Sequence, residues 1–183
     1  MGERILGVDP GLETTGYGLI ETADRRVKYL ASGTVVTRPS ESLALRLVAL
    51  HVQFTRLLEA LSPHMVVLEE LYAHYRHPMT AILMGHARGV ITLAMAERGV
   101  PLICYLPTRV KKAVTGHGHA TKTQVQGMVT SLLGLACRPE PDDVSDALAL
   151  ALTHTRTLSE PRLATMLKNR KRALPAALQE ALR

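Results

Sequence analysis

The sequence predicts an α/β fold in which a mixed five-stranded sheet, antiparallel in one half and parallel in the other, is flanked by helices. Within the first 36 residues, three β-favouring segments follow one another through short polar turns, which is typical of an antiparallel meander. Two later apolar runs are separated by helical patterns, which indicates parallel crossover connections. With 183 residues and 46% apolar composition, the chain is expected to form one domain with a proper core.

The first three expected strands cover residues 4–9, 17–21 and 27–36. The first is a short apolar run that ends in Asp9, and the Pro10-Gly11 pair after it marks a turn. The polar segment 22–26 is the turn between the second and third strands.

The remaining expected elements alternate between helices and strands. Apolar residues recur at helical spacing between Leu43 and Leu61, and Ser62-Pro63 ends that helix. The apolar run 65–68 is a buried strand that ends in Glu69-Glu70. A helix is expected over 79–98 and a strand over 102–106. A helix that starts near residue 108 follows and is interrupted at 116–119. Two further helices are expected over 121–133 and 142–157.

The charge balance favours a polyanionic partner. Lys and Arg number 22 against 16 Asp and Glu, and residues 98–139 contain no acid. That acid-free segment holds Arg109, Lys111, Lys112 and Lys122. Clustered cations are typical of nucleic-acid binding, although a soluble protein that is merely basic shows the same balance.

Cysteine usage and hydropathy suggest the compartment. Cys104 and Cys137 lie in separate segments without a metal-binding spacing, so we expect free thiols in a reducing, cytoplasmic environment. We find no signal peptide and no apolar run long enough to span a membrane, so no membrane partner is expected. We expect one domain over residues 1–157 and a basic tail over 158–183 that is partly disordered.

Acidic residues recur where strands end and where the last helix begins. Asp143 and Asp146 are spaced i, i+3 and share one face of that helix, where they repel each other unless a cation lies between them. Without a metal site, Asp9 could simply start a turn, and helix capping could account for one acid at the start of the last helix. Capping accounts less well for the three acids at that helix start. The acids are Asp9, Glu69, Glu70, Asp142, Asp143 and Asp146.

Carboxylates from three separated segments can meet only in a folded site. Hard oxygen ligands without a His or Cys spacing suit Mg²⁺ or Mn²⁺ rather than zinc. Two such ions, about 3.5–4 Å apart, can clamp the attacking and leaving oxygens of a phosphodiester. Together with the basic segment, this pattern predicts a metal-dependent nuclease.

Up to about residue 155, the chain resembles the RuvC-type Holliday-junction resolvases, motif after motif and in order. The motifs are ILGVDPG at 5–11, TGYG at 15–18, LEELY at 68–72, GHARGV at 85–90, RVKK at 109–112, KTQVQ at 122–126 and DVSDALA at 143–149. The resemblance implies an RNase H-like fold. It also implies a crossover junction endodeoxyribonuclease of recombination and repair, a cytoplasmic homodimer that nicks four-way DNA junctions symmetrically. Mg²⁺ or Mn²⁺ is the implied cofactor, with two ions per active site, and a RuvA–RuvB branch-migration complex the implied partner.

The resemblance also assigns roles to individual residues. The metal-binding acids of the family fall on Asp9, Glu69, Asp143 and Asp146, whereas Glu70 and Asp142 are only neighbours of matched positions. The family's stacking aromatic falls on Tyr72, and its basic residues near the scissile strand fall on Lys111 and Lys122. The expected DNA contacts are Tyr72, Arg76, Arg109, Lys111, Lys112 and Lys122, and Lys122 is also an expected catalytic residue.

Several residues keep a second interpretation. Lys122 could instead hold phosphate without taking part in catalysis, and Tyr72 could be a core residue. Gly85 and Gly89, one turn apart on the second helix, mark a close approach either at a dimer interface or against the sheet. His117 and His119 suit a flexible loop beside DNA better than a metal site.

Two other classes of protein share part of this sequence pattern. An ATPase of the actin and sugar-kinase type shares the first loop pattern, but 183 residues do not contain its second nucleotide-binding subdomain. A module that holds branched DNA without cutting it has the basic surface but does not need the complete set of acids.

Overall fold

The structure is a computed structural model that describes residues 2–24, 26–70 and 78–158. Within these ranges the strands are β1 (Glu3–Asp9), β2 (Thr14–Ala23), β3 (Arg26–Val36), β4 (Met65–Glu69) and β5 (Leu102–Tyr105). The helices are α1 (Leu43–Leu61), α2 (Pro78–Glu97), α3 (Pro107–Thr115), α4 (Lys122–Leu132) and α5 (Asp142–Leu158). The expected basic tail and the loop at 71–77 lie outside the described residues.

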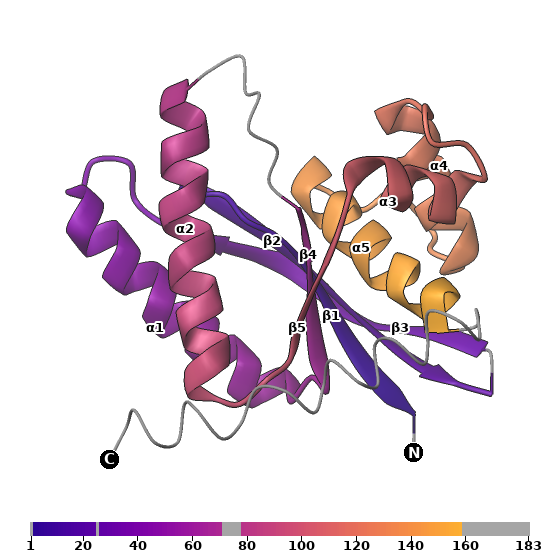
Figure 1. Cartoon of the computed structure of the whole chain (residues 1–183), viewed down its shortest axis with the longest axis horizontal. Helices are drawn as coiled ribbons and strands as arrows, with labels where there is room; N and C mark the ends of the chain where they lie inside the picture. The colour runs from indigo at the N-terminus through magenta and orange to yellow at the C-terminus, as the bar shows by residue number, and fades with distance from the viewer. Residues whose placement is uncertain (1, 25, 71–77, 159–183) are drawn as a thin grey trace.

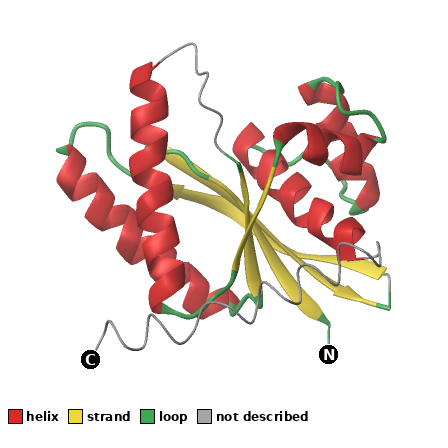
Figure 2. Cartoon of the chain, viewed as in Figure 1, coloured by secondary structure: helices red, strands yellow, loops and turns green. Residues whose placement is uncertain are grey.

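The strands form one mixed sheet in the order β3-β2-β1-β4-β5. The pairs β1–β2 and β2–β3 are antiparallel, whereas β1–β4 and β4–β5 are parallel. The expected fold class is therefore confirmed, with the meander and the crossover half meeting at β1. Figure 2 shows the sheet between two layers of helices, and Figure 1 shows α1 and α2 on one face and α3, α4 and α5 on the other.

Alternate residues of the central strands face different helices. Ile5 of β1 and Met65 of β4 belong to the core shared with α5, whereas Leu6 and Val66 belong to the core shared with α1 and α2. Strand side chains alternate between the two faces of a sheet, so every second residue after Ile5 and Met65 lies on the face that α5 covers. The last residues of these strands, Asp9 in β1 and Glu69 in β4, therefore lie on that face.

Local signals set the ends of the helices. The Ser42 hydroxyl accepts a hydrogen bond from the Leu45 amide and caps α1, which ends at Ser62 in the left-handed conformation. Thr121 and Gln124 form a reciprocal capping box at the start of α4. Gly116, with φ of 85°, ends α3 and creates the expected break before α4.

One structural finding differs from the sequence expectation about membranes. Within the described residues, the segment Met79–Glu97 of α2 is long and apolar enough to cross a membrane, with a mean hydropathy of 1.3. A single helix of this kind is weak evidence, because core helices of soluble proteins have the same length and composition. Ala87, Ile91, Ala94 and Met95 of α2 are buried in the core against the sheet, which accounts for part of that composition.

Three glycines let α5 lie directly against β1 and β2. A Cβ atom on Gly7 would overlap the carbonyl oxygen of Ala147, and it would lie 2.9 Å from the Ala151 nitrogen. A Cβ on Gly16 would overlap the carbonyl of Asp143, and one on Gly18 would overlap the Leu148 side chain. Glycine in strands is thus used here for close backbone approach, and the approach fixes where the first turns of α5 lie.

Replacing Gly7 with Ala is expected to destabilise the fold by about 2 kcal/mol, because the clashing atoms are backbone and the helix itself must shift. Thermal or denaturant unfolding of the purified variant measures the change. Gly127→Ala in α4 is the matched control, since an added Cβ there meets nothing within 4 Å. An unchanged stability for Gly7→Ala would show that α5 does not pack as closely as described.

Candidate active site

Two of the predicted acids end adjacent parallel strands. Asp9 is the last residue of β1 and Glu69 is the last residue of β4, and the residues just before them, Val8 and Leu68, are paired in register. Both carboxylates therefore emerge at the same edge of the sheet. Glu70, the next residue, is exposed, and its backbone amide donates to the Tyr105 carbonyl at 2.8 Å.

The other two predicted acids reach this edge on α5. Asp9 pairs with Gly16 of β2, and Gly16 lies directly against the backbone of Asp143 at the start of α5. Asp146 follows one turn later on the same helix. The close approach that the glycine allows thus brings the α5 acids next to the end of β1.

The charges of the four acids act on one another. Burial, followed by the charges of Asp146, Asp143 and Glu69, raises the pKa of Asp9 to about 7. Burial and then the Asp146 charge raise the pKa of Glu69, while Lys111 and Arg88 lower it. Burial is also the main cause that raises the pKa of Asp143. The nearby cations, Lys111, Lys122 and Arg88, therefore do not fully offset the effects of burial and of the neighbouring acids on these carboxyl groups.

Lys122, the first residue of α4, provides a cation at this site. Its Nζ lies 3.1 Å from Asp146 Oδ2 and 3.3 Å from Asp142 Oδ2. Partial burial opposes its charge, but the contacts with Asp146 and Asp142 raise the pKa of the Lys122 ammonium. Asp142 also accepts a hydrogen bond from Gln126 Nε2 at 2.7 Å.

The acids fit a divalent cation by their chemistry, although their side chains are not gathered around one point. Over residues 2–24, 26–70 and 78–158, no group of three or more His, Cys, Asp or Glu side chains is close enough to hold a metal ion. Asp146 is paired with Lys122 at 3.1 Å. All four donors are hard oxygens, and burial, followed by the charges of neighbouring acids, raises the pKa of Asp9. A divalent cation would neutralise that negative charge.

The basic segment lies on α3 and α4, next to α5. Arg109, Lys111 and Lys112 are on α3, and Lys111 acts electrostatically on Glu69. Lys112 is exposed, whereas Arg109 is partly buried and its Nη2 donates to Thr157 Oγ1 at 3.5 Å. The segment thus provides cations both beside the acids and on the neighbouring surface.

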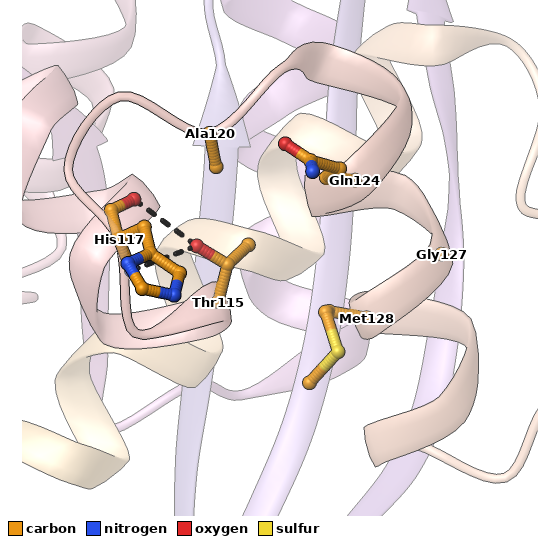
Figure 3. A pocket seen from close by; sticks show the side chains of 6 residues that line it. All are labelled: Thr115, His117, Ala120, Gln124, Gly127 and Met128. Atoms are coloured by element: carbon orange, nitrogen blue, oxygen red, sulfur yellow. Dashed lines mark hydrogen bonds between the residues drawn. The ribbon is translucent and has the colours of Figure 1, made fainter.

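The break between α3 and α4 encloses a small hollow of about 350 Å³ (Figure 3). The hydroxyl of Thr115 donates to the His117 carbonyl and accepts from the His117 amide, both at 3.1 Å, which fixes the turn. In the part of the chain that the structure describes, neither His117 nor His119 belongs to a metal-binding group.

Arg88 is a residue at this site that the sequence patterns did not single out. Its Nη1 donates to the backbone carbonyl of Glu69, and its Nη2 lies 3.1 Å from Cys104 Sγ. It therefore ties α2 to the ends of β4 and β5. In the sequence, Arg88 stands out only as part of the GHARGV motif, and the motif does not indicate which residues Arg88 contacts.

The two α2 glycines have open surroundings among the described residues. An added Cβ on Gly85 or Gly89 would meet nothing within 4 Å there, so no close approach to the sheet is seen at either glycine, and their role at a dimer interface stays a prediction. Tyr72 and Arg76, the other predicted DNA contacts, lie outside the described residues. Their predicted roles stay predictions.

A mixed sheet in this order, with acids at the ends of its central strands and on the helix that covers them, is the arrangement of an RNase H-like nuclease. The family model described as "Crossover junction endodeoxyribonuclease RuvC" matches residues 5–154. The chain belongs to the RuvC family of crossover junction endodeoxyribonucleases.

Individual relatives agree with this assignment. A crossover junction endodeoxyribonuclease RuvC of Rhodopirellula baltica is 48% identical over 148 residues, which cover 81% of this chain and 83% of that protein. One of Syntrophomonas wolfei is 42% identical and covers 91% of this chain and 94% of that protein.

Solved structures agree as well. The structure titled "T. thermophilus RuvC in complex with Holliday junction substrate" has a TM-score of 0.78 and 37% identity, over 83% of this chain and 92% of that one. A yeast mitochondrial Holliday junction resolvase, 16% identical with a TM-score of 0.64 over 92% of this chain and 82% of that one, supports the fold alone.

Proposed function

We propose that this protein binds four-way DNA junctions and cuts them with a pair of symmetric nicks, and that one domain over residues 1–157 carries this activity. The observation that carries the proposal is that acids of β1, β4 and α5 lie along one edge of the sheet, near enough for their charges to act on one another, beside the cations of α3 and α4. A relative of 37% identity has been solved with a Holliday junction substrate.

Asp9, Glu69, Asp143 and Asp146 are the residues that would hold Mg²⁺ or Mn²⁺, two ions per site. The chemistry that such ions would supply is activation of a water as the nucleophile and stabilisation of the leaving 3′ oxygen, and the cut would leave 5′-phosphate and 3′-hydroxyl ends. The protein orients the strand and supplies fixed carboxylates on rigid elements, which keeps the site ready for the phosphodiester.

Lys122 would neutralise the charge that builds on the phosphate during cutting, because its ammonium already lies beside Asp146. Lys111, Lys112 and Arg109 would hold the flanking backbone through phosphate contacts, which position the strand without reading its sequence. Tyr72 and Arg76 remain proposed DNA contacts on the basis of the family motif.

A homodimer would let two identical sites cut the two strands of a two-fold junction. The open positions of Gly85 and Gly89, together with the exposed apolar side chains of Met79, Ile82 and Leu93, support an interface on α2. Only 22% of the apolar segment of α2 is buried within one subunit. A RuvA–RuvB branch-migration complex is the partner expected to deliver junctions, and two free cysteines suit a cytoplasmic setting.

The direct test is to incubate the pure protein with a synthetic four-way junction and Mg²⁺ or Mn²⁺, and to map the nicks on each strand. Paired nicks at symmetric positions in opposing strands support the proposal. A protein that shifts the junction on a gel but never nicks it with either metal would instead be a binding module.

Junction binding is expected to weaken steeply as salt rises, because cations of the protein displace counterions from phosphate. With about four phosphate contacts, the affinity should fall roughly a hundredfold between about 50 and 200 mM salt. Fluorescence anisotropy with a labelled junction, in the absence of divalent metal, measures the slope. A flat response would contradict the role of the basic segment.

A further inference from the structure

We propose that Asp142 is a positioning residue for Lys122, and that the buried side chain of Gln126 holds Asp142 in place. This inference rests on the proposed function, because it concerns the lysine beside the acids of that site. It assigns a task to an acid that lies next to a predicted metal ligand but is not matched to one by the family motif.

The contacts form a continuous chain from the protein interior to the acid site. Gln126 of α4 is only 3% exposed, and its Nε2 donates to Asp142 Oδ1 at 2.7 Å. The other oxygen of Asp142, Oδ2, lies 3.3 Å from Lys122 Nζ. That ammonium also reaches Asp146 Oδ2 at 3.1 Å, so two carboxylates one helical turn apart hold it.

The ion pair between Lys122 and Asp142 adds little to stability, because both side chains are exposed, by 53% and 59%. A lysine on a flexible four-carbon stem nevertheless gains a defined position when two fixed acceptors hold its ammonium. Gln126 provides the fixed point, because a buried amide keeps its hydrogen bond.

The two carboxylates that hold Lys122 therefore have different tasks. Asp146 belongs to the proposed metal-binding set, and a divalent cation would draw its charge away from Lys122. Asp142 has one oxygen with Gln126 and the other with Lys122, so it keeps the ammonium at the site when Asp146 is engaged elsewhere. Lys122 then stays where it can meet the phosphate.

The first test reads the position of Lys122 in the metal-free protein with Asp146→Asn as background, because Asp146 would otherwise still hold the ammonium; every variant of this test is made in that background. An ammonium held by an ion pair exchanges its protons slowly and gives a signal in a ¹H–¹⁵N spectrum of lysine side chains at low temperature. The Lys122 signal, assigned by its absence in Lys122→Met, should be present in the background protein and lost in Asp142→Asn. In that variant the amide still offers Oδ1 to Gln126 but turns an N–H group toward Lys122.

Glu140→Gln is the matched control, because it removes the same charge from an exposed residue two positions away. The Lys122 signal should persist in this control and should weaken in Gln126→Met, where the anchor of Asp142 is gone. Persistence of the signal in Asp142→Asn would overturn the proposal. Its loss in Glu140→Gln as well would overturn it too, by showing a general charge effect.

The second test is a double-mutant cycle on nicking, with junction affinity and melting temperature measured in parallel. Asp142→Asn should slow nicking about tenfold with unchanged junction affinity, and it should have no further effect when combined with Lys122→Met. Additive losses would show that Asp142 does not act through Lys122. If Lys122→Met cuts normally, the catalytic role of Lys122 fails, whereas the ammonium signal still decides whether Asp142 holds it.

Discussion

Replacing Asp9 with Asn is expected to reduce junction nicking by at least about a thousandfold, which corresponds to about 4 kcal/mol of transition-state stabilisation. Asp9 lies at the centre of the charged site, since Asp146, Asp143 and Glu69 all raise its pKa. An amide keeps the shape of the side chain but removes the charge that would hold a divalent cation. Gel assays with a labelled junction and Mg²⁺ or Mn²⁺ measure the rate.

Junction affinity should stay within a few-fold of the wild type, because the phosphate contacts are made by other residues. Asp24→Asn is the matched control, as Asp24 is exposed in the turn after β2 and has a left-handed φ of 49° that asparagine also adopts. Loss of binding together with nicking in Asp9→Asn would indicate a structural role. Nicking at the wild-type rate would remove Asp9 from the chemistry.

The same substitution is expected to stabilise the metal-free protein by up to about 4 kcal/mol at pH 8, because burial and the neighbouring acids raise the pKa of Asp9 from 3.8 to about 7. An acid with a raised folded-state pKa binds its proton more tightly in the folded state. The wild type therefore loses stability as pH rises through the window from 3.8 to about 7.

Thermal or urea unfolding in the presence of a chelator, from pH 4 to pH 8, measures the difference between wild type and Asp9→Asn. The difference should be small near pH 4, grow toward pH 7 and stay level above it. Asp24→Asn should follow the wild type throughout. A constant difference across this range would mean that Asp9 does not titrate as described. Adding Mg²⁺ should stabilise the wild type more than Asp9→Asn.

Most of the fold could be predicted because its signals are local. The polar turn after β2 and the single apolar stripe of α1 are short-range patterns, and the parallel half of the sheet followed from helices placed between the later strands. The predicted bounds of most elements are close to those observed, although β2 begins at Thr14, earlier than the expected Tyr17. That strand carries Gly16 and Gly18, which weaken a strand pattern in sequence and are explained only by the packing of α5.

The candidate site was predictable as a set of acids but not as an arrangement. Residue type and element ends pointed to Asp9 and to Glu69 and Glu70, and helical spacing pointed to Asp143 and Asp146. The family resemblance then selected Glu69 over Glu70. The chain from Gln126 through Asp142 to Lys122 joins two helices, and no sequence period reports such a contact. Arg88 was missed for the same reason, since its partners lie on β4 and β5.

The most direct test of the shared acid site is a calorimetric titration of Mn²⁺ into the metal-free protein and into four variants, Asp9→Asn, Glu69→Gln, Asp143→Asn and Asp146→Asn, with Asp24→Asn as control. If the acids of β1, β4 and α5 form one site, each of the four replacements should weaken Mn²⁺ binding, while the Asp24→Asn control binds Mn²⁺ like the wild type. Wild-type affinity in the Asp9, Asp143 and Asp146 variants would show that these residues do not share a metal site.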